Sequence, residues 1–269
     1  LITNKGAFIG LIALVNSILQ NCNEDDLNNL YFHLLIDLDE TEKLENLIKQ
    51  SKLTFNYGIT EFDNPSSRKF IIDTMNTNIH DGIKHILNFG RFFISSIYNN
   101  LDKIIYIDCD MICQGDITEL RDEYFHLLDD DNQLLAVKCD NQGDVSKTVL
   151  DKYNISSHNF KYFNAGIFIT SLANWRQNNI EDQLLYWMKE NKEHSLFNLG
   201  TQPILNITFI NKVKYIDSRW NTLGLGGNTR LRRKYLNNGK ILHWNGARKW
   251  CNKDGLYKHY GEKYNVIRE

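Results

Sequence analysis

In the segment KIIYIDCDMICQGDI, residues 103–117, an apolar run leads directly into two carboxylates. The apolar residues Ile104 to Ile107 are followed by Asp108 and Asp110. Side chains alternate between the two faces of a strand, so we expect the two aspartates to point to the same side. Two carboxylates on one side repel each other unless a cation or a cationic ligand lies between them. The stretch therefore predicts a buried strand, and its end resembles a metal site without establishing one.

Two further Asp-x-Asp triplets weaken the motif when it is taken alone. Asp129 and Asp131 lie in DDDN with no strand before them, which is typical of a solvated turn. Asp37 and Asp39 follow the apolar run YFHLLID, but Asp39 precedes Glu42 by three residues, as in a helix cap with a capping box. Context alone leaves the triplet at residues 108–110 open between a functional pair and a chance one.

Composition is that of an ordinary globular protein, with 269 residues, 42% hydrophobic and 24% charged. The net charge is −2 and no basic stripe stands out, which argues against nucleic acid or an anionic membrane as the main partner. No apolar run approaches the roughly 20 residues that span a bilayer. Five cysteines without a CxxC pair argue against a zinc site.

Strand-like and helix-like segments alternate along the first half of the chain. Apolar runs predict strands at residues 31–37, 53–62 and 103–108, and helical spacing predicts helices at 10–20, 41–50 and 86–98. Such alternation implies βαβ units and a mostly parallel sheet with helices on both faces. Ligands bind beyond the carboxyl ends of the strands in such sheets, where Asp108 and Asp110 are expected.

The second half of the chain is less regular. LLAVKCD (134–140), YFNAGIFITS (162–171), ILNITF (204–209) and KVKYID (212–217) predict strands, and IEDQLLYWMKENK (180–192) predicts a helix. Asn206 is expected to be buried in the strand ILNITF. The tail KILHWNGARKW (240–250) predicts a strand that breaks into a glycine turn. Without a repeat or a low-complexity linker, one domain is the better prediction.

Five segments in this order together resemble glycosyltransferase family 8, and most of all its eukaryotic branch, the glycosyltransferase 8 domain-containing and galacturonosyltransferase-like proteins. The segments are LNFGRFFI, LDKIIYIDCDMICQGDITEL, YFNAGIFITSLANWR, QPILNITF and ILHWNGARKW. The resemblance implies an α/β fold of the GT-A type, a Rossmann-like mixed sheet with helices on both faces in a single fused domain. It also implies a nucleotide-binding half at 1–115, an acceptor and donor-sugar half at 116–240 and a C-terminal lid at 241–269.

The resemblance implies that Asp108, Asp110 and His243 hold Mn²⁺, which bridges the diphosphate of a UDP-sugar, and that Asp108 also touches the ribose. Carboxylates with one imidazole suit Mn²⁺. A lone histidine on a strand is more often a half-buried structural residue than a metal ligand. The position of His243 directly before the family-like tail favours the ligand instead.

The resemblance assigns further donor contacts. Gly246 would let the backbone approach a phosphate, and Lys249 would face the leaving diphosphate. The family usually reads Lys-Pro-Trp, whereas Lys249 is followed directly by Trp250. Thr3 and Asn4 stand where the family reads the nucleotide base, although the usual Thr-Asp pair is missing.

Three residues are assigned to the sugar side by the same resemblance. Arg91 would face the donor from a helix, Asn164 would lie near the donor sugar and the acceptor, and Gln202 would lie beside the anomeric carbon. Thr201 and Pro203 flank Gln202 where bacterial members carry acidic residues. Recognition of the donor-sugar hydroxyls is therefore expected to differ from theirs.

The activity that the resemblance implies is retaining transfer of a hexosyl or pentosyl unit from a UDP-sugar to a glycan or other hydroxyl acceptor. Two alternatives stay open. One is a catalytically weak UDP-sugar-binding protein that acts as a partner or chaperone, and the other is a metal-dependent phosphohydrolase. We expect a Golgi or secretory location through an N-terminal anchor that precedes this sequence, with a cytoplasmic location as the alternative. A homodimer also stays open.

Overall fold

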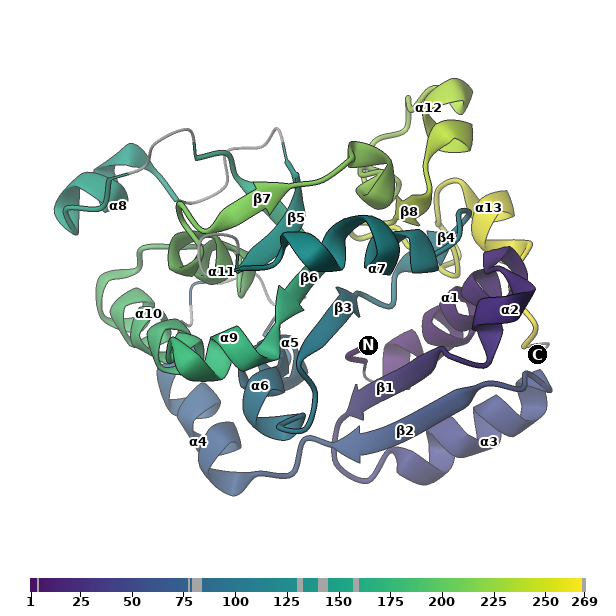
Figure 1. The fold of residues 1–269 in the computed structure, drawn as a ribbon, viewed down its shortest axis with the longest axis horizontal. Helices are drawn as coiled ribbons and strands as arrows, with labels where there is room; N and C mark the ends of the chain where they lie inside the picture. Colours follow the sequence, from purple (N-terminus) through teal and green to yellow (C-terminus); the bar gives the residue numbers. More distant parts are fainter. Residues whose placement is uncertain are drawn as a thin grey trace. The chain divides into compact units, whose positions relative to one another are not determined.

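The computed structural model describes residues 1–3, 5–76, 78, 84–129, 133–139, 145–156 and 160–267. The chain divides into two compact units, each built from segments that are distant in sequence. The first unit comprises Leu1–Phe62, Tyr106–Glu123 and Asp217–Glu269, and the second comprises Asp63–Ile105 and Tyr124–Ile216. Both units contain helices and strands (Figure 1).

Parallel strands joined by a helix begin the first unit. β1 and β2 pair in parallel and are connected by α3, which confirms the predicted βαβ order. Ile2 bridges in parallel both to Leu35 of β1 and to Asp108, so the N-terminal residues join the end of β1 to the Asp-x-Asp triplet. The elements wholly or mainly in this unit are η1 (Lys5–Ala7), α1 (Phe8–Asn21), α2 (Glu24–Leu27), β1 (Tyr31–Ile36), α3 (Thr41–Ser51), β2 (Asn56–Glu61), β4 (Met111–Cys113), α7 (Thr118–Tyr124), η5 (Ser218–Asn221), α12 (Arg233–Asn238), β8 (Ile241–His243) and α13 (Lys258–Glu262).

Helix α1 is a core helix of this unit and supports the candidate site. It is buried from Gly10 through Ile18, as expected of a helix that is apolar nearly all round. It packs against β4 and α3. A Cβ atom at Gly10 would lie 2.6 Å from the carbonyl oxygen of Cys109. The glycine therefore allows α1 to approach the turn that carries the two aspartates.

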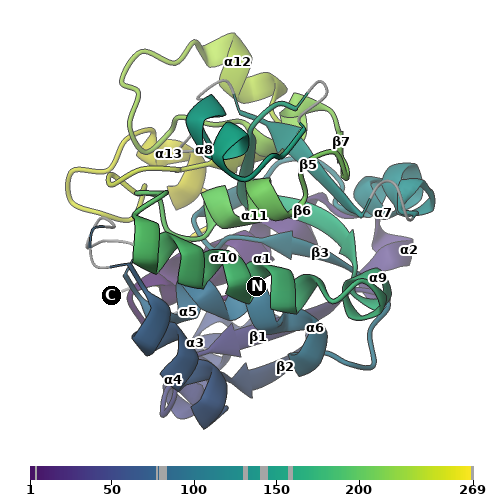
Figure 2. The ribbon, with the colours of Figure 1, turned by 90° about the vertical axis from the view of Figure 1, so that its left-hand side faces the viewer.

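A mixed four-stranded sheet with the order β3–β6–β5–β7 dominates the second unit. β5 is antiparallel to β6 and parallel to β7, and all nine residues of β6 are buried. Helix α11 packs on β6, and α10 packs on α11 (Figure 2). The elements are α4 (Pro65–Thr74), α5 (Ile86–Gly90), η3 (Arg91–Phe93), α6 (Ile94–Ile97), β3 (Lys103–Ile107, whose last two residues fall in the first unit), η4 (Phe125–Leu127), β5 (Leu134–Lys138), α8 (Lys147–Lys152), β6 (Phe163–Ser171), α9 (Leu172–Gln177), α10 (Ile180–His194), α11 (Gln202–Thr208) and β7 (Val213–Tyr215).

The predicted strand at ILNITF is wrong, because residues Gln202–Thr208 form helix α11. Pro203 lies in the first turn of this helix, where its missing N–H costs nothing. A short buried apolar run does not distinguish a strand from a helix by its period. The burial predicted for Asn206 is confirmed, since the residue is 0% exposed. Its amide exchanges hydrogen bonds of 2.8 and 2.9 Å with the backbone of Phe163.

The predicted cap at Asp39 is also wrong. The N-cap residue of α3 is Glu40, which makes no side-chain capping hydrogen bond, and Asp39 has a left-handed backbone with φ 62°. A carboxylate one residue too early, in that conformation, cannot act as the N-cap. Asp131 of the third triplet lies outside the described residues.

The single helix predicted for residues 86–98 is divided into α5, the 3-10 turn η3 and α6. Gly90 has low helix propensity, and Phe89, Phe92 and Phe93 are all buried. Arg91 begins the turn η3 and is itself 7% exposed.

Candidate active site

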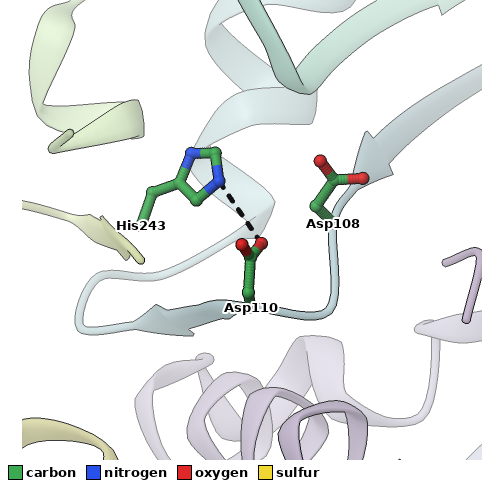
Figure 3. Close-up of side chains that lie close together, drawn as sticks. All are labelled: Asp108, Asp110 and His243. Atoms are coloured by element: carbon green, nitrogen blue, oxygen red, sulfur yellow. Dashed lines mark ion pairs between the residues drawn. The ribbon is translucent and has the colours of Figure 1, made fainter. Parts of the chain in front are cut away.

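The two aspartates lie in the connection between β3 and β4 (Figure 3). Asp108 forms the bridge with Ile2, while Cys109 and Asp110 form a turn. The two carboxylates therefore converge through a turn, and not through the alternation of a continuous strand as the sequence predicted. The hydroxyl of Tyr106 donates to Oδ1 of Asp108 at 2.7 Å and orients that carboxylate.

Strand pairing brings His243 to the same place from more than 130 residues along the chain. β8 runs antiparallel to β4, and the register pairs His243 with Met111. The backbone N–H of Trp244 donates to the carbonyl of Asp110 at 3.0 Å. One ligand atom each of Asp108, Asp110 and His243 then lie within 4.8 Å of one another. The sequence-predicted metal ligands are therefore brought together.

Asp110 is the electrostatic centre of this cluster, with a side chain that is 21% exposed. Its Oδ1 lies 3.3 Å from Nε2 of His243, and its Oδ2 forms an ion pair with the ammonium of Lys249. Burial raises the pKa of Asp110, but interactions with His243 and Lys249 outweigh this and hold the pKa well below its usual range. The site thus keeps Asp110 ionised, which is the form that binds a cation.

The other nitrogen of His243 faces a residue that the sequence did not single out. Nδ1 lies 2.9 Å from Oδ1 of Asn221, and both residues are at most 3% exposed. Asn221 ends the short helix η5 in a segment without motif or period, so no sequence signal marked it. Only the fold places it beside the histidine.

The donor atoms of the cluster fit a divalent cation. Oδ1 of Asp110 is buried, and when Nε2 of His243, 3.3 Å away, carries no hydrogen, this oxygen has no donor among the residues that the structure describes. A buried carboxylate oxygen without a donor is costly unless a cation compensates it. Carboxylate oxygens with one imidazole nitrogen are ligands that Mn²⁺ accepts. The residues present therefore fit the metal that the sequence predicted.

The segment after β8 carries Lys249 into contact with the cluster. Besides its ion pair with Asp110, the ammonium of Lys249 donates to the carbonyl of Trp244 at 2.7 Å. Trp244 and Trp250 are buried, and the indole N–H of Trp244 donates to the carbonyl of Leu256 at 2.7 Å. These contacts place the ammonium of Lys249, which the resemblance assigned to the diphosphate, directly beside Asp110.

Gly246 allows this segment to lie against the backbone of Gly226. Its φ is 129°, and a Cβ atom there would lie 2.8 Å from the carbonyl carbon and oxygen of Gly226. The backbone N–H of Arg248 donates to the same carbonyl at 3.1 Å. In the described chain Gly246 thus lies close to Gly226, and its approach to a phosphate stays a prediction.

The three residues assigned to the sugar side form a second cluster, within the second unit. Oε1 of Gln202 accepts from the amide of Asn164 and from the N–H of Ala165, each at 3.0 Å. Oδ1 of Asn164 accepts from the N–H of Gly166 at 3.0 Å. Arg91 donates to the carbonyl of Ala165 at 3.1 Å. The start of β6 thus holds all three side chains in one network.

The residues assigned to the nucleotide base are only partly described. Thr3 is 4% exposed, and its N–H donates to the carbonyl of Leu35 at 3.0 Å, beside the end of β1. Asn4 lies outside the described residues. The assignment of base contacts to this pair stays a prediction.

The fold and the first cluster define the class: an α/β protein with a candidate divalent-metal site at the carboxyl end of a strand. A family model described as glycosyl transferase family 8 matches residues 2–253. The chain therefore belongs to glycosyl transferase family 8, and the predicted resemblance is confirmed.

Curated relatives agree with this family. The chain is 29% identical over 265 residues to "Probable galacturonosyltransferase-like 9" of Arabidopsis thaliana, covering 91% of this chain and 64% of the relative. It is 30% identical over 263 residues to "Glycosyltransferase 8 domain-containing protein 2" of Homo sapiens, covering 88% of this chain and 73% of the relative. The chain thus spans less than two thirds of the length of the plant relative.

Solved structures show the fold. The galactosyltransferase LgtC, in complex with donor and acceptor sugar analogues, aligns with a TM-score of 0.74 at 19% identity and covers all of this chain and 95% of its own. Mouse xyloside xylosyltransferase 1 aligns with a TM-score of 0.60 at 16% identity, covering 91% of this chain and 96% of its own. The predicted fold class, α/β of the GT-A type, is confirmed.

Proposed function

We propose that this chain is a retaining glycosyltransferase that moves a hexosyl or pentosyl unit from a UDP-sugar to a hydroxyl group of a glycan. The observation that carries the proposal is the convergence of Asp108, Asp110 and His243 in a member of glycosyl transferase family 8. The relatives' names differ in the sugar that they transfer, galacturonosyl, galactosyl or xylosyl. The proposal therefore names the class of donor and not the sugar.

In this proposal the first cluster binds the diphosphate of the donor. Asp108, Asp110 and His243 would hold Mn²⁺, which supplies a Lewis acid for the negative charge that grows on the leaving UDP. Lys249 lies beside Asp110 and would offer its ammonium to the phosphate oxygens. Both groups would stabilise the leaving group electrostatically, without forming a bond to the sugar.

The second cluster supports a reaction without a covalent enzyme intermediate. Oε1 of Gln202 already accepts two hydrogen bonds, and an amide oxygen is a weak nucleophile. In a front-face reaction, the bond from the anomeric carbon to the diphosphate oxygen breaks as the acceptor oxygen bonds to the same face. The acceptor proton passes to the departing phosphate. Arg91, Asn164 and Gln202 would then position the sugar, and none of them needs to act as a base.

Calorimetry with UDP tests the metal-dependent part of this proposal. We expect UDP to bind with Mn²⁺ more tightly than with Mg²⁺, because the site combines carboxylates with an imidazole. Equal affinity in EDTA would refute a metal-dependent donor site. A screen of UDP-sugars for UDP release, with and without sugar acceptors, tests transfer itself. Metal-dependent binding with no release from any donor would favour the UDP-sugar-binding protein instead.

We also propose a secretory location for the full-length protein. No helix within the described ranges is both long and apolar enough to cross a membrane. Imaging of the full-length natural protein with organelle markers tests the location, and a diffuse cytoplasmic signal would refute it.

A further inference from the structure

Asn221 faces His243 with an atom that can only accept a hydrogen bond. Its Oδ1 lies 2.9 Å from Nδ1 of His243, and Asn221 is 2% exposed. An amide oxygen cannot donate, so Nδ1 must carry the hydrogen of this contact. The nitrogen that remains for a metal is then Nε2, which is the nitrogen that faces Asp110.

The ring of His243 lies between two competing acceptors. Asn221 accepts at Nδ1, and Oδ1 of Asp110 lies 3.3 Å from Nε2 on the opposite side. A neutral imidazole has a single N–H, and the partner that holds it decides which nitrogen keeps a free lone pair. With the hydrogen on Nε2, the ring would bind Asp110 and could not ligate a metal. With the hydrogen on Nδ1, the lone pair of Nε2 and Oδ1 of Asp110 point toward the same position, where a cation could bind both.

The backbone fixes Asn221 and His243 relative to each other. Thr222, the next residue, forms a parallel bridge with Leu242. The N–H of His243 donates to the carbonyl of Thr222 at 3.0 Å, and the N–H of Thr222 donates to the carbonyl of Ile241 at 2.8 Å. The contact between Asn221 and His243 is therefore set by strand-like pairing on both sides of it.

We propose that Asn221 is a positioning residue of the metal site, which holds the hydrogen of His243 on Nδ1 and so leaves Nε2 free for the cation. This inference rests on the proposed metal-dependent function. Hydrogen bonds of this kind, from the distal nitrogen of a metal-binding histidine to a carbonyl, orient the ring and fix its tautomer. Asn221 would act through His243 and would not touch the metal itself.

Titration of Mn²⁺ alone into the full chain, followed by electron paramagnetic resonance of the free ion, tests the proposal without an activity assay. We expect Asn221→Leu, which keeps the branched shape of the side chain and removes the acceptor, to weaken Mn²⁺ binding by about 10- to 100-fold. Asn221→Asp keeps an acceptor at the same position, and this variant should bind Mn²⁺ about as tightly as the wild type. Asn16→Leu is the matched control, because Asn16 is also buried in the first unit and its amide donates to the carbonyl of Tyr264 at 2.8 Å.

Nitrogen NMR of the chain labelled at histidine supplies a second readout that a merely structural role would not change. His243→Gln identifies the signal, and in the wild-type chain with a neutral ring we expect hydrogen on Nδ1. Hydrogen on Nε2 would overturn the proposal, even if Asn221→Leu fails to fold. Wild-type Mn²⁺ binding that Asn221→Leu leaves unchanged would also overturn it, while the proposed function would stand. A wild-type chain that binds no Mn²⁺ would overturn both.

Discussion

Replacing Gly246 with alanine tests whether the tail that carries Lys249 depends on a close approach between two backbones. Gly246 has φ 129°, and its Cβ would meet the backbone of Gly226 at 2.8 Å. Holding an L-residue in such a conformation costs about 1–3 kcal/mol. Forcing a methyl group against backbone that cannot rotate away costs a further 1–3 kcal/mol, approximately. The tail in its native position therefore loses about 2–6 kcal/mol relative to a displaced tail.

Urea unfolding and a UDP titration in Mn²⁺ measure this loss. We expect Gly246→Ala to lower the free energy of unfolding and to weaken UDP binding by about 30-fold or more, since 2 kcal/mol corresponds to that factor. Gly227→Ala is the matched control, because a Cβ at Gly227 meets nothing within 4 Å. Equal stability and equal UDP affinity in the two variants would refute the reasoning.

Three further substitutions test the charges of the chain. Asp110→Asn should abolish Mn²⁺-dependent UDP binding and turnover while circular dichroism stays that of the wild type; retained metal-dependent binding would contradict the assignment of Asp110. Lys249→Met should lower the free energy of unfolding of the ligand-free protein by about 1–3 kcal/mol. This range lies between those for exposed and for buried ion pairs, because the side chains of Lys249 and Asp110 are 32% and 21% exposed. Unchanged urea unfolding would show that the pair contributes nothing. Burial raises the pKa of Glu181, so its charged form destabilises the fold as the pH rises through that pKa. Glu181→Gln should therefore raise the melting temperature at about pH 8, a gain that disappears by about pH 4, and the same gain at both pH values would contradict this.

Local pattern was sufficient for much of the chain. The apolar run at residues 31–37 and the amphipathic spacing at 41–50 predicted β1 and α3, because the period of burial is set within each element. The strand before Asp108 followed from the same rule. The strand predicted at ILNITF was wrong because a short buried helix and a buried strand can have the same apolar composition. Pro203 was the signal for a helix start. The roles expected of His243 and Lys249 came from resemblance to a family and not from periodicity.

Most elements and the acidic end of β3 could therefore be predicted from local pattern, since these depend on neighbours within a few residues. The side chains that meet Asp110 depend instead on the tertiary fold. The antiparallel register of β4 and β8 brings His243 to it, and the pairing of Thr222 beside β8 brings Asn221 to the far side of the ring. Contacts across more than 100 residues depend on the packing of everything between them, and a buried amide such as Asn221 carries no local signal. Its partner becomes known only when both backbones are in place.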